Sequence, residues 1–363
     1  MGYKDMEEGC GSPWRIQKRY ALEPGDLLAL SLFVLATHQL YLFAYFIIQD
    51  TYLRNLTTIT EFLILGFENL HTLKLLLFFI FLIIYIFTVG GNLMIIVLVL
   101  TSHHVQSPMY FFLSHLSFCD VLLTTNAVPN MLRVIVEEGS TMSVNGCLTQ
   151  FYLLCSSTIA ECFLLMVMSY DRYLAICIPL RYFSIMSHTF CLILVFFSWT
   201  FGTMLPLMAV IPVFHLHFCG DNVIDHFYCD FAPLMELSCS DTTLVEREVF
   251  VSSIPTVVLP FIFIVVTYVY IFFTIMNIPS TKGRKKAFST CSSHLSVVSA
   301  YYGTLIIKYM VPFRGHSVSI NKTVSLLYTV FTPLFNPLIY SLRNKEIVVA
   351  IQKYFLQRQI LKM

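Results

Sequence analysis

Seven long apolar runs between Leu73 and Leu342 restrict the possible folds of this chain more than any other feature of its sequence. A transmembrane helix needs about 20 consecutive, mostly apolar residues, and every run reaches that length. Only helices and closed barrels satisfy their own backbone hydrogen bonds in lipid, and these runs are too long for barrel strands. The sequence therefore predicts an all-α membrane protein, a bundle of seven transmembrane helices. The runs cover approximately residues 73–99, 108–131, 146–176, 189–211, 248–277, 288–310 and 320–341.

The composition supports this class and excludes two others. The 363 residues are 57% hydrophobic and only 12% charged, whereas soluble domains have about 25% charged residues. A soluble fold with so little charge could not cover its surface, and a disordered chain would not carry 15% aromatic residues. The net charge of +1 provides no electrostatic footprint for nucleic acid. We therefore expect membrane lipid, and no nucleic acid, as a partner.

Lysine and arginine are unevenly distributed among the segments that join the runs, and this bias predicts the orientation of the bundle. Short cytosolic loops of membrane proteins are enriched in both residues. The loop between runs five and six and the segment after run seven are basic, whereas the segment between runs four and five is acidic. We expect the N-terminus of the bundle outside and the C-terminus in the cytosol. The basic residues are Lys282, Arg284, Lys285, Lys286, Arg343, Lys345, Lys353, Arg358 and Lys362.

Residues 1–54 form an atypical N-terminal extension with an additional apolar segment at 27–48. Arg15, Lys18 and Arg19 precede this segment, so it could insert as a signal anchor. An alternative start or a gene-model extension is the other interpretation, and a cleaved signal peptide fits less well because no A-x-A site follows. The remaining chain divides into a seven-transmembrane domain at 55–343 and a cytosolic tail at 344–363 with a short amphipathic helix.

The predicted outer side carries a glycosylation acceptor and several cysteines. Asn55 begins an Asn-Leu-Thr triplet just before the first run. Three cysteines lie in the acidic outer segment and a fourth opens the third run, and four cysteines allow three disulfide pairings. The alternative is a metal site made by His226, Cys229 and Asp230, but a paired thiol is not free to bind a metal, so we favour disulfides and expect no metal. The four cysteines are Cys147, Cys219, Cys229 and Cys239.

Polar residues inside the runs indicate a functional interior, because ionisable groups are costly at bilayer depth. Asp120 and Glu161 are the clearest, and Asn92 and Asn336 are neutral candidates for the same region. Two carboxyl groups at this depth cannot both stay charged without compensation. They either share an allosteric Na⁺, or one is protonated, or each simply hydrogen-bonds between helices. No other cofactor is expected.

Four motifs, in order along the chain, resemble olfactory receptors, and the match runs from about Asn55 to about Tyr354. The first two are Pro108-Met109-Tyr110-Phe111-Phe112-Leu113 with Leu116-Ser117-Phe118-Cys119-Asp120, and Met168-Ser169-Tyr170-Asp171-Arg172-Tyr173-Leu174-Ala175-Ile176-Cys177. The other two are Lys286-Ala287-Phe288-Ser289-Thr290-Cys291-Ser292-Ser293-His294 and Pro333-Leu334-Phe335-Asn336-Pro337-Leu338-Ile339-Tyr340. Ser169 replaces the usual Ala, and the N-terminal extension has no counterpart in the family.

The resemblance implies a rhodopsin-like seven-helix receptor of the plasma membrane, a multi-pass protein and not an enzyme. Such a receptor binds a small, mostly apolar volatile ligand and activates a stimulatory olfactory-type G protein, which raises cyclic AMP. The resemblance also implies the disulfides Cys147–Cys229 and Cys219–Cys239. A transporter or channel is a weaker interpretation because symmetric half-helices are not evident. A membrane enzyme is weaker still, because no H-E-x-x-H, G-x-S-x-G or P-loop motif occurs.

An apolar ligand requires a dry pocket, and we expect it in the outer half of the bundle. On the third run, residues one to three turns outside Glu161 face the same interior. On the sixth, Tyr302 and Tyr309 are seven residues apart and share a helical face. The alternative for each of these residues is that it packs in the core and does not contact the ligand. The candidate ligand-binding residues are Phe151, Leu154, Cys155, Thr158, Ser252, Ser253, Thr256, Tyr302, Leu305 and Tyr309.

The cytosolic half carries the candidate activation switch. Asp171 can hold Arg172 in a charge-assisted pair at rest and release it toward the G protein on activation. At 100° per residue, Leu154, Glu161 and Arg172 share one stripe of the third run. A solvated helix end would explain the Asp-Arg pair alone. The remaining candidates for coupling are Tyr173, Tyr268, Lys285, Lys286, Asn336, Pro337 and Tyr340, with the tail helix from Asn344 to about Tyr354.

Lys308 departs from the family, which usually has an apolar residue at this position. It lies near the outer end of the sixth run. One interpretation is that its ammonium group snorkels to the membrane interface. The other is that it hydrogen-bonds a carbonyl or carboxylate group of the odorant.

Overall fold

The computed structural model describes residues 59–67, 73–102, 107–219, 221–310, 318–343, 347–349 and 352. The apolar segment 27–48, Asn55 and most of the tail after Arg343 lie outside these residues. So do the side chains of Lys286 and Tyr309.

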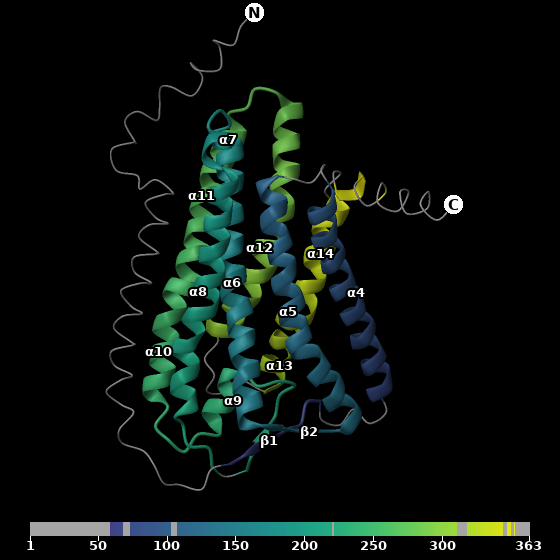
Figure 1. Ribbon diagram of the computed structural model, residues 1–363, viewed down its shortest axis with the longest axis vertical. Coiled ribbons are helices and arrows are strands. Elements are labelled where there is room, and N and C mark those ends of the chain that lie inside the picture. The colour runs from purple at the N-terminus through teal and green to yellow at the C-terminus, as the bar shows by residue number, and fades with distance from the viewer. Residues whose placement is uncertain are drawn as a thin grey trace, which may run out of the picture.

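Seven helical stretches of the described chain form a bundle, and each contains one predicted run to within a residue or two (Figure 1). Two of the stretches contain a π-helical turn, labelled η. The first four stretches are α4 (Lys74–Thr101), α5 (Pro108–Glu137), α6 (Val144–Cys177) and α8 (His188–Phe214). The fifth is α10 (Thr243–Ser253), η2 (Ile254–Val258) and α11 (Leu259–Met276), and the sixth is α12 (Thr281–Met310). The seventh is α13 (Val318–Leu326), η3 (Leu327–Phe331) and α14 (Thr332–Arg343).

Hydropathy alone identifies most of this bundle. The first five stretches are long and apolar enough to cross a membrane. The sixth and seventh stretches carry more polar residues, which lower their mean hydropathy. They are nevertheless helices of similar length. The prediction of a seven-helix membrane bundle is therefore confirmed.

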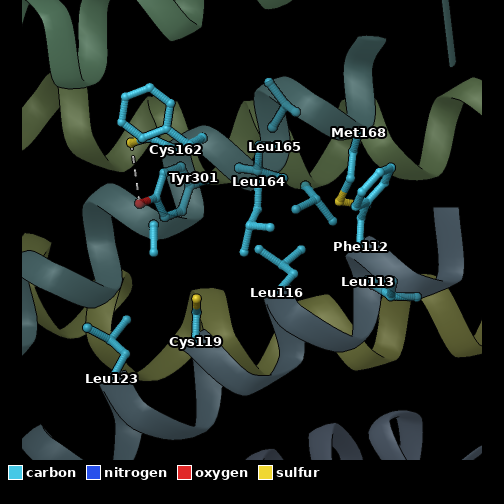
Figure 2. Packing of buried hydrophobic residues seen from close by; sticks show 14 of the residues in the cluster. Phe112, Leu113, Leu116, Cys119, Leu123, Cys162, Leu164, Leu165, Met168 and Tyr301 are labelled. Carbon is cyan, nitrogen blue, oxygen red and sulfur yellow. Dashed lines mark hydrogen bonds between the residues drawn. The ribbon is translucent and has the colours of Figure 1, made fainter. Parts of the chain in front are cut away.

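α6 is the central helix of the bundle and packs against α5, α8 and α11. In Figure 2, side chains from α5 and α6, including Leu116 and Leu164, point toward one another; both are buried. Gly202 of α8 lies so close to α6 that a Cβ at this position would be 2.7 Å from the Cβ of Ala160. Without a side chain at Gly202, the two helices approach closely.

Prolines explain the π-helical turn in the fifth stretch. Pro260 has no N–H to donate to the carbonyl one turn earlier, which breaks the hydrogen-bond ladder of the helix. The N–H of Leu259 donates to the carbonyl of Ile254, five residues back, so the turn widens just before the proline. The widened turn places Thr256 on the buried side.

A small outer layer covers the end of the bundle at which α9 (Phe231–Glu236) lies (Figure 1). Strand β1 (Glu61–Ile64) pairs antiparallel with β2 (Ser140–Ser143) and parallel with β3 (Val223–Ile224). This sheet was not predicted, because its strands are only two to four residues long and gain their partners from distant parts of the chain. The short helix α7 (Tyr182–Ile185) lies at the opposite end.

Candidate functional site

Two disulfides fix the loop that covers the outer end of the bundle. Cys147 at the start of α6 is bonded to Cys229, and Cys219 is bonded to Cys239. Of the three pairings that the sequence allows, this is the one implied by the resemblance. Gln150, one turn further along α6, accepts a hydrogen bond from the backbone N–H of Cys229 at 3.0 Å. The loop is therefore attached to α6 by a disulfide bond and by a hydrogen bond to a buried side-chain amide.

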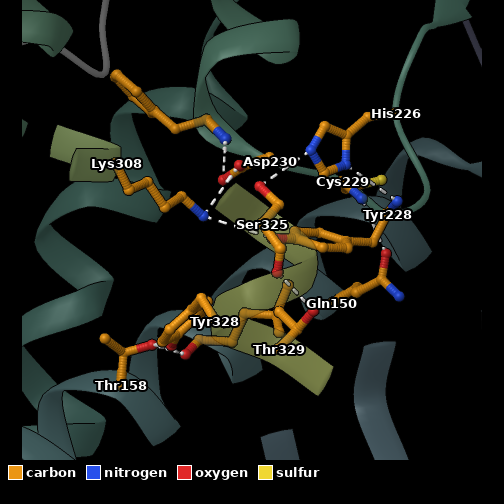
Figure 3. Close-up of polar contacts among 12 residues, drawn as sticks. Gln150, Thr158, His226, Tyr228, Cys229, Asp230, Lys308, Ser325, Tyr328 and Thr329 are labelled. Atoms are coloured by element: carbon orange, nitrogen blue, oxygen red, sulfur yellow. Dashed lines mark hydrogen bonds and ion pairs between the residues drawn. The ribbon is translucent and has the colours of Figure 1, made fainter. Parts of the chain in front are cut away.

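An outer polar cluster lies directly beneath this loop (Figure 3). We define it as Lys308, Asp230, Tyr228, Tyr328, His226 and Ser325. Nζ of Lys308 lies 3.0 Å from Oδ2 of Asp230 and 3.5 Å from the hydroxyl of Tyr228. It also lies over the rings of Tyr228 and Tyr328, 5.7 and 5.3 Å from their centroids. Such cation–π contacts strengthen when the cation is desolvated.

Lys308 therefore points inward. Its side chain is only 12% exposed, which excludes the interpretation that it snorkels to the membrane interface. Burial raises the pKa of Asp230, but the charge and hydrogen bond of Lys308 act together with smaller effects, such as the hydrogen bond from the backbone N–H of Phe231, and the pKa lies below its ordinary value. The pair is ionised, and it joins the outer loop to α12.

His226 completes the cluster on the side of α13. Its Nε2 lies 3.2 Å from Oγ of Ser325. Burial lowers the pKa of His226 to about 4; Lys308 and Lys322 act in the same direction, and Asp230 and Asp225 oppose them. The imidazole is therefore neutral at neutral pH. Lys322 in turn binds Asp225 and the carbonyl of Gly66.

The alternative of a metal site at His226, Cys229 and Asp230 is not supported. Cys229 is in a disulfide, Asp230 pairs with Lys308, and His226 bonds to Ser325. In the described part of the chain, no group of three or more histidine, cysteine or acidic side chains is placed to hold a metal ion.

Four of the ten predicted ligand-binding residues lie beneath the outer polar cluster, on α6 and α12. Leu154, Thr158 and Leu305 are buried, and Cys155 lies within electrostatic range of Lys308 and Asp230. The hydroxyl of Thr158 hydrogen-bonds that of Tyr328, as Figure 3 shows. Three separate helices therefore meet below the loop.

The remaining predicted ligand residues are more dispersed. Phe151 stacks on Phe231 at 6.3 Å and so belongs to the packing under the loop. Tyr302 is buried, but its ring packs on Phe261 of α11 at 4.9 Å, toward the groove between α11 and α12. Thr256 is buried, whereas Ser252 and Ser253 are half-buried. All three hydroxyls donate to carbonyls of their own helix.

Two tyrosines that the sequence did not single out are central to the site. The hydroxyl of Tyr301 donates to the carbonyl of Thr158 at 2.7 Å, and its side chain is 1% exposed. Tyr328 contacts Lys308 and Thr158 from η3. Helical spacing favoured Tyr302 over Tyr301, and the position of Tyr328 depends on the π-helical turn, which spacing at 3.6 residues per turn does not predict.

A second polar group lies at mid-membrane depth. Asn336 of α14 donates to both carboxylate oxygens of Asp120, at 3.0 and 2.9 Å. Asp120 also hydrogen-bonds Glu161 of α6, so these three residues lie together. Asn92 of α4 is also buried, but its side chain donates to the backbone carbonyls of Thr88 and Pro333 rather than to Asp120 or Glu161.

The mid-membrane group fits a Na⁺ ion chemically. Oxygen atoms are the ligands that hard cations prefer. Oε1 of Glu161 is buried and has no hydrogen-bond partner among the described residues. Asp120 and Glu161 would hold the ion, which would neutralise charge that burial otherwise makes costly.

At the cytosolic end, Asp171 holds Arg172 in place. Nη2 and Nε of Arg172 lie 2.5 and 3.0 Å from Oδ2 of Asp171. The hydroxyl of Tyr182 in α7 donates to the other carboxylate oxygen at 2.8 Å. Asp171 is fully buried. Arg172 and Tyr182 together provide hydrogen bonds to both of its carboxylate oxygens.

The other predicted switch residues surround Arg172 or support it. The hydroxyl of Tyr268 lies 2.7 Å from Nδ1 of His294, and both groups are within electrostatic range of Arg172. Tyr340 is buried, and its hydroxyl has no hydrogen-bond partner among the described residues. Tyr173 instead packs against the rings of Tyr170 and Tyr270.

Pro337 and Lys285 occupy more peripheral positions. The ring of Pro337 lies against Gly91 of α4, where an added Cβ would be only 3.2 Å away. Lys285 is exposed in the first turns of α12, at the cytosolic surface.

The sequence matches the family model of olfactory receptors over residues 81–358. It is 46% identical to human olfactory receptor 11L1 over 300 residues, which cover 83% of this chain and 93% of that protein. It is 45% identical to human olfactory receptor 11A1 over 302 residues, which cover 83% of this chain and 96% of that protein.

The fold is similar to that of squid rhodopsin in its crystal structure, with a TM-score of 0.64 at 16% identity, over 79% of this chain and 86% of that chain. This likeness shows the rhodopsin-like arrangement of the helices, and the sequence matches show the family. The protein is a multi-pass receptor of the plasma membrane rather than an enzyme, and it belongs to the olfactory receptor family.

Proposed function

We propose that this receptor binds a small, mostly apolar volatile ligand beneath the outer loop and activates a stimulatory olfactory-type G protein, raising cyclic AMP. One observation carries the proposal: the outer polar cluster, the mid-membrane carboxyl group and the cytosolic arginine are all in contact with a single helix, α6. Thr158, Glu161 and Arg172 mark these three levels. A ligand that favours one arrangement of the outer level can shift the equilibrium of the whole bundle.

The chemistry of the outer level indicates which ligands fit. Leu154 and Leu305 provide apolar surface, and burial is worth about 0.8 kcal/mol for each CH₂ group of the ligand. Lys308 is the one unusual polar feature, and its charge is already compensated by Asp230. A neutral carbonyl group can accept a hydrogen bond from Lys308 without repulsion from Asp230. An acid would have to compete with that carboxylate, so we propose aldehydes, ketones and esters ahead of acids.

The cytosolic level would act as the switch. In the arrangement described here, Asp171 neutralises Arg172. Breaking this pair would free the guanidinium for the G protein, and Lys285 and Lys286 would extend the docking surface. Signalling requires that the ligand stabilise the arrangement with the free guanidinium more than the paired one, because equal affinity shifts nothing.

We also propose that Na⁺ acts as an allosteric ion at Asp120 and Glu161. Oε1 of Glu161, which lacks a partner among the described residues, is the observation in support. An ion there would stabilise whichever arrangement keeps α5, α6 and α14 together.

The direct test is a ligand-panel assay of cyclic AMP in cells expressing the full chain or a version starting near Leu53. Each should respond to a subset of neutral carbonyl odorants, and the response should require the stimulatory G protein. Cells without that G protein serve as the control. A receptor that reaches the surface, binds an odorant and yet signals only through an inhibitory G protein would contradict the proposed coupling.

A further inference from the structure

A groove runs between α11 and α12, apart from the outer polar cluster and from the Asp171–Arg172 pair, although Tyr268 and Tyr302 form part of its lining. Its volume is about 720 Å³. On α11 the lining extends from Phe261 to Ile275, and on α12 it extends from Phe288 to Ile306. At about 1.5 Å per residue these stretches measure roughly 21 and 27 Å. The hydrocarbon of one leaflet is about 15 Å thick, so the groove can hold an acyl chain along its full length.

The lining of the groove is hydrocarbon. Val269 of α11 and Leu295 of α12 are 49% and 44% exposed, so the groove opens outward to the membrane. Two of its polar side chains are already engaged: the hydroxyl of Tyr268 bonds His294, and that of Ser292 donates to the carbonyl of Ser289. A ligand with hydrogen-bonding groups would gain nothing along this surface, whereas a lipid tail would be contacted by two helices at once.

The cytosolic end of the groove is basic. Phe288 is the lining residue of α12 nearest that end. Arg284 and Lys285 precede it by four and three residues, so both lie on its side of the helix, one turn closer to the cytosol. The cytosolic leaflet is rich in anionic lipids, and each nearby lysine or arginine attracts them by about 1 kcal/mol.

We propose that this groove is a binding site for an anionic phospholipid of the cytosolic leaflet, with one acyl chain between α11 and α12 and the headgroup against Arg284 and Lys285. The Tyr268–His294 contact on the groove floor lies beside Arg172. A bound chain therefore contacts Tyr268 beside the Asp171–Arg172 pair. The site depends on neither the odorant nor the G protein.

The test uses the purified full-length receptor in nanodiscs, without G protein or odorant. The discs contain phosphatidylserine or phosphatidylcholine with a photoactivatable group in one acyl chain. Cross-linked peptides are expected from 261–275 and 288–306, several-fold more with phosphatidylserine than with phosphatidylcholine. High salt should reduce this preference, because it screens the headgroup contact. Labelling spread evenly over α4 and the groove would overturn the site, and equal labelling by both lipids would overturn the anionic headgroup.

Two variants make the test specific. Leu295→Trp fills the groove and should reduce labelling of 261–275 at least threefold. Ile86→Trp is the matched control, because Ile86 is a 59% exposed residue of α4 outside the groove. Arg284→Gln with Lys285→Gln should bring the ratio of the two lipids close to one. Unchanged labelling in a monodisperse Leu295→Trp receptor would refute the proposal.

Discussion

The ammonium nitrogen of Lys308 lies 3.0 Å from a carboxylate oxygen of Asp230, so an ion pair joins α12 to the loop that covers the bundle. The loop is also bonded covalently to α6 through Cys147 and Cys229. The outer ends of two helices are therefore coupled through one loop. Any ligand that binds below it must act in the presence of this pair.

Replacing Lys308 should change which odorants are detected. In Lys308→Met the hydrogen-bond donor is lost and the apolar surface grows, so responses should shift from aldehydes and other carbonyl compounds toward hydrocarbons. Concentration–response curves for chain-matched aldehydes and alkanes measure the shift, and we expect at least a tenfold loss of potency for the aldehydes. An unchanged profile would show that Lys308 does not contact the ligand.

The same pair provides a control for stability. Asp230→Asn alone leaves a buried ammonium without its counter-charge, which should cost about 3 kcal/mol. The double variant Lys308→Met, Asp230→Asn removes both charges and should recover most of the thermal stability. Additive losses in the two single variants and the double variant would show that the two residues are not coupled.

Arg172 is expected to be essential for signalling but not for delivery. The Arg172→Ala receptor should reach the cell surface at near wild-type levels, because Tyr182 still donates a hydrogen bond to the buried Asp171. It should produce no odorant-dependent cyclic AMP. Surface labelling and the cyclic AMP assay on the same cells separate the two effects, and a signalling Arg172→Ala receptor would exclude the switch.

Tyr182 is expected to restrain the switch. Its hydroxyl donates to Asp171 at 2.8 Å, and hydrogen bonds to charged groups contribute about 1.5–3 kcal/mol. In Tyr182→Phe, Asp171 holds Arg172 in a less fixed geometry, so basal cyclic AMP should rise several-fold without odorant. Phe183→Leu is a suitable control, because Phe183 is the adjacent residue and is 86% exposed. A basal signal equal to that of the control would contradict this restraint.

Sodium dependence tests the mid-membrane group. The melting temperature of the purified receptor should rise when NaCl replaces choline chloride at constant ionic strength. Glu161→Gln removes one ionisable ligand and should abolish this difference. If the wild-type receptor melts at the same temperature in both salts, no ion binds there and the carboxyls serve only as hydrogen-bonding groups.

The buried His226 predicts a loss of stability in acid. Its pKa is about 4 in the folded receptor and about 6.5 when unfolded, so the unfolded chain binds the proton more readily between these values. The free energy of unfolding should therefore decrease as pH falls from about 6.5 to about 4, by about 3 kcal/mol in total. Asp230 contributes only at lower pH, because its pKa is reduced below its ordinary value. In His226→Asn the melting temperature should vary less over this range, and an equally steep decline would identify another group as the cause.

The sequence predicted the bundle well because membrane insertion depends on local composition. Each apolar run became a helix, and even the polar residues at mid-membrane depth came together, since Asp120, Glu161 and Asn336 have few alternatives to one another in lipid. The contact between Asp171 and Arg172 followed from their adjacency in the chain.

The outer site was predicted less completely, because it is built by a loop with no periodic pattern. The sequence suggested Lys308 as an interface residue or a ligand contact, but not that it pairs with Asp230, 78 residues earlier in the chain. Tyr301 and Tyr328 were missed for a related reason. Their orientations depend on how α12 and the π-helical turn η3 are rotated, and rotation is set by packing rather than by the residues' own spacing.

Strand β1 gives the beginning of the described chain a mechanical role. It hydrogen-bonds on one edge to the strand that leads into α6, and on the other to the disulfide-bonded loop. Force on the backbone just before Ile59 would be transmitted to β2, which leads into α6, and to the disulfide-bonded loop above the proposed ligand site. A bulky fusion or tag placed at this point would act on the loop above the proposed ligand site. Epitope labels for trafficking studies therefore belong at the opposite, cytosolic terminus.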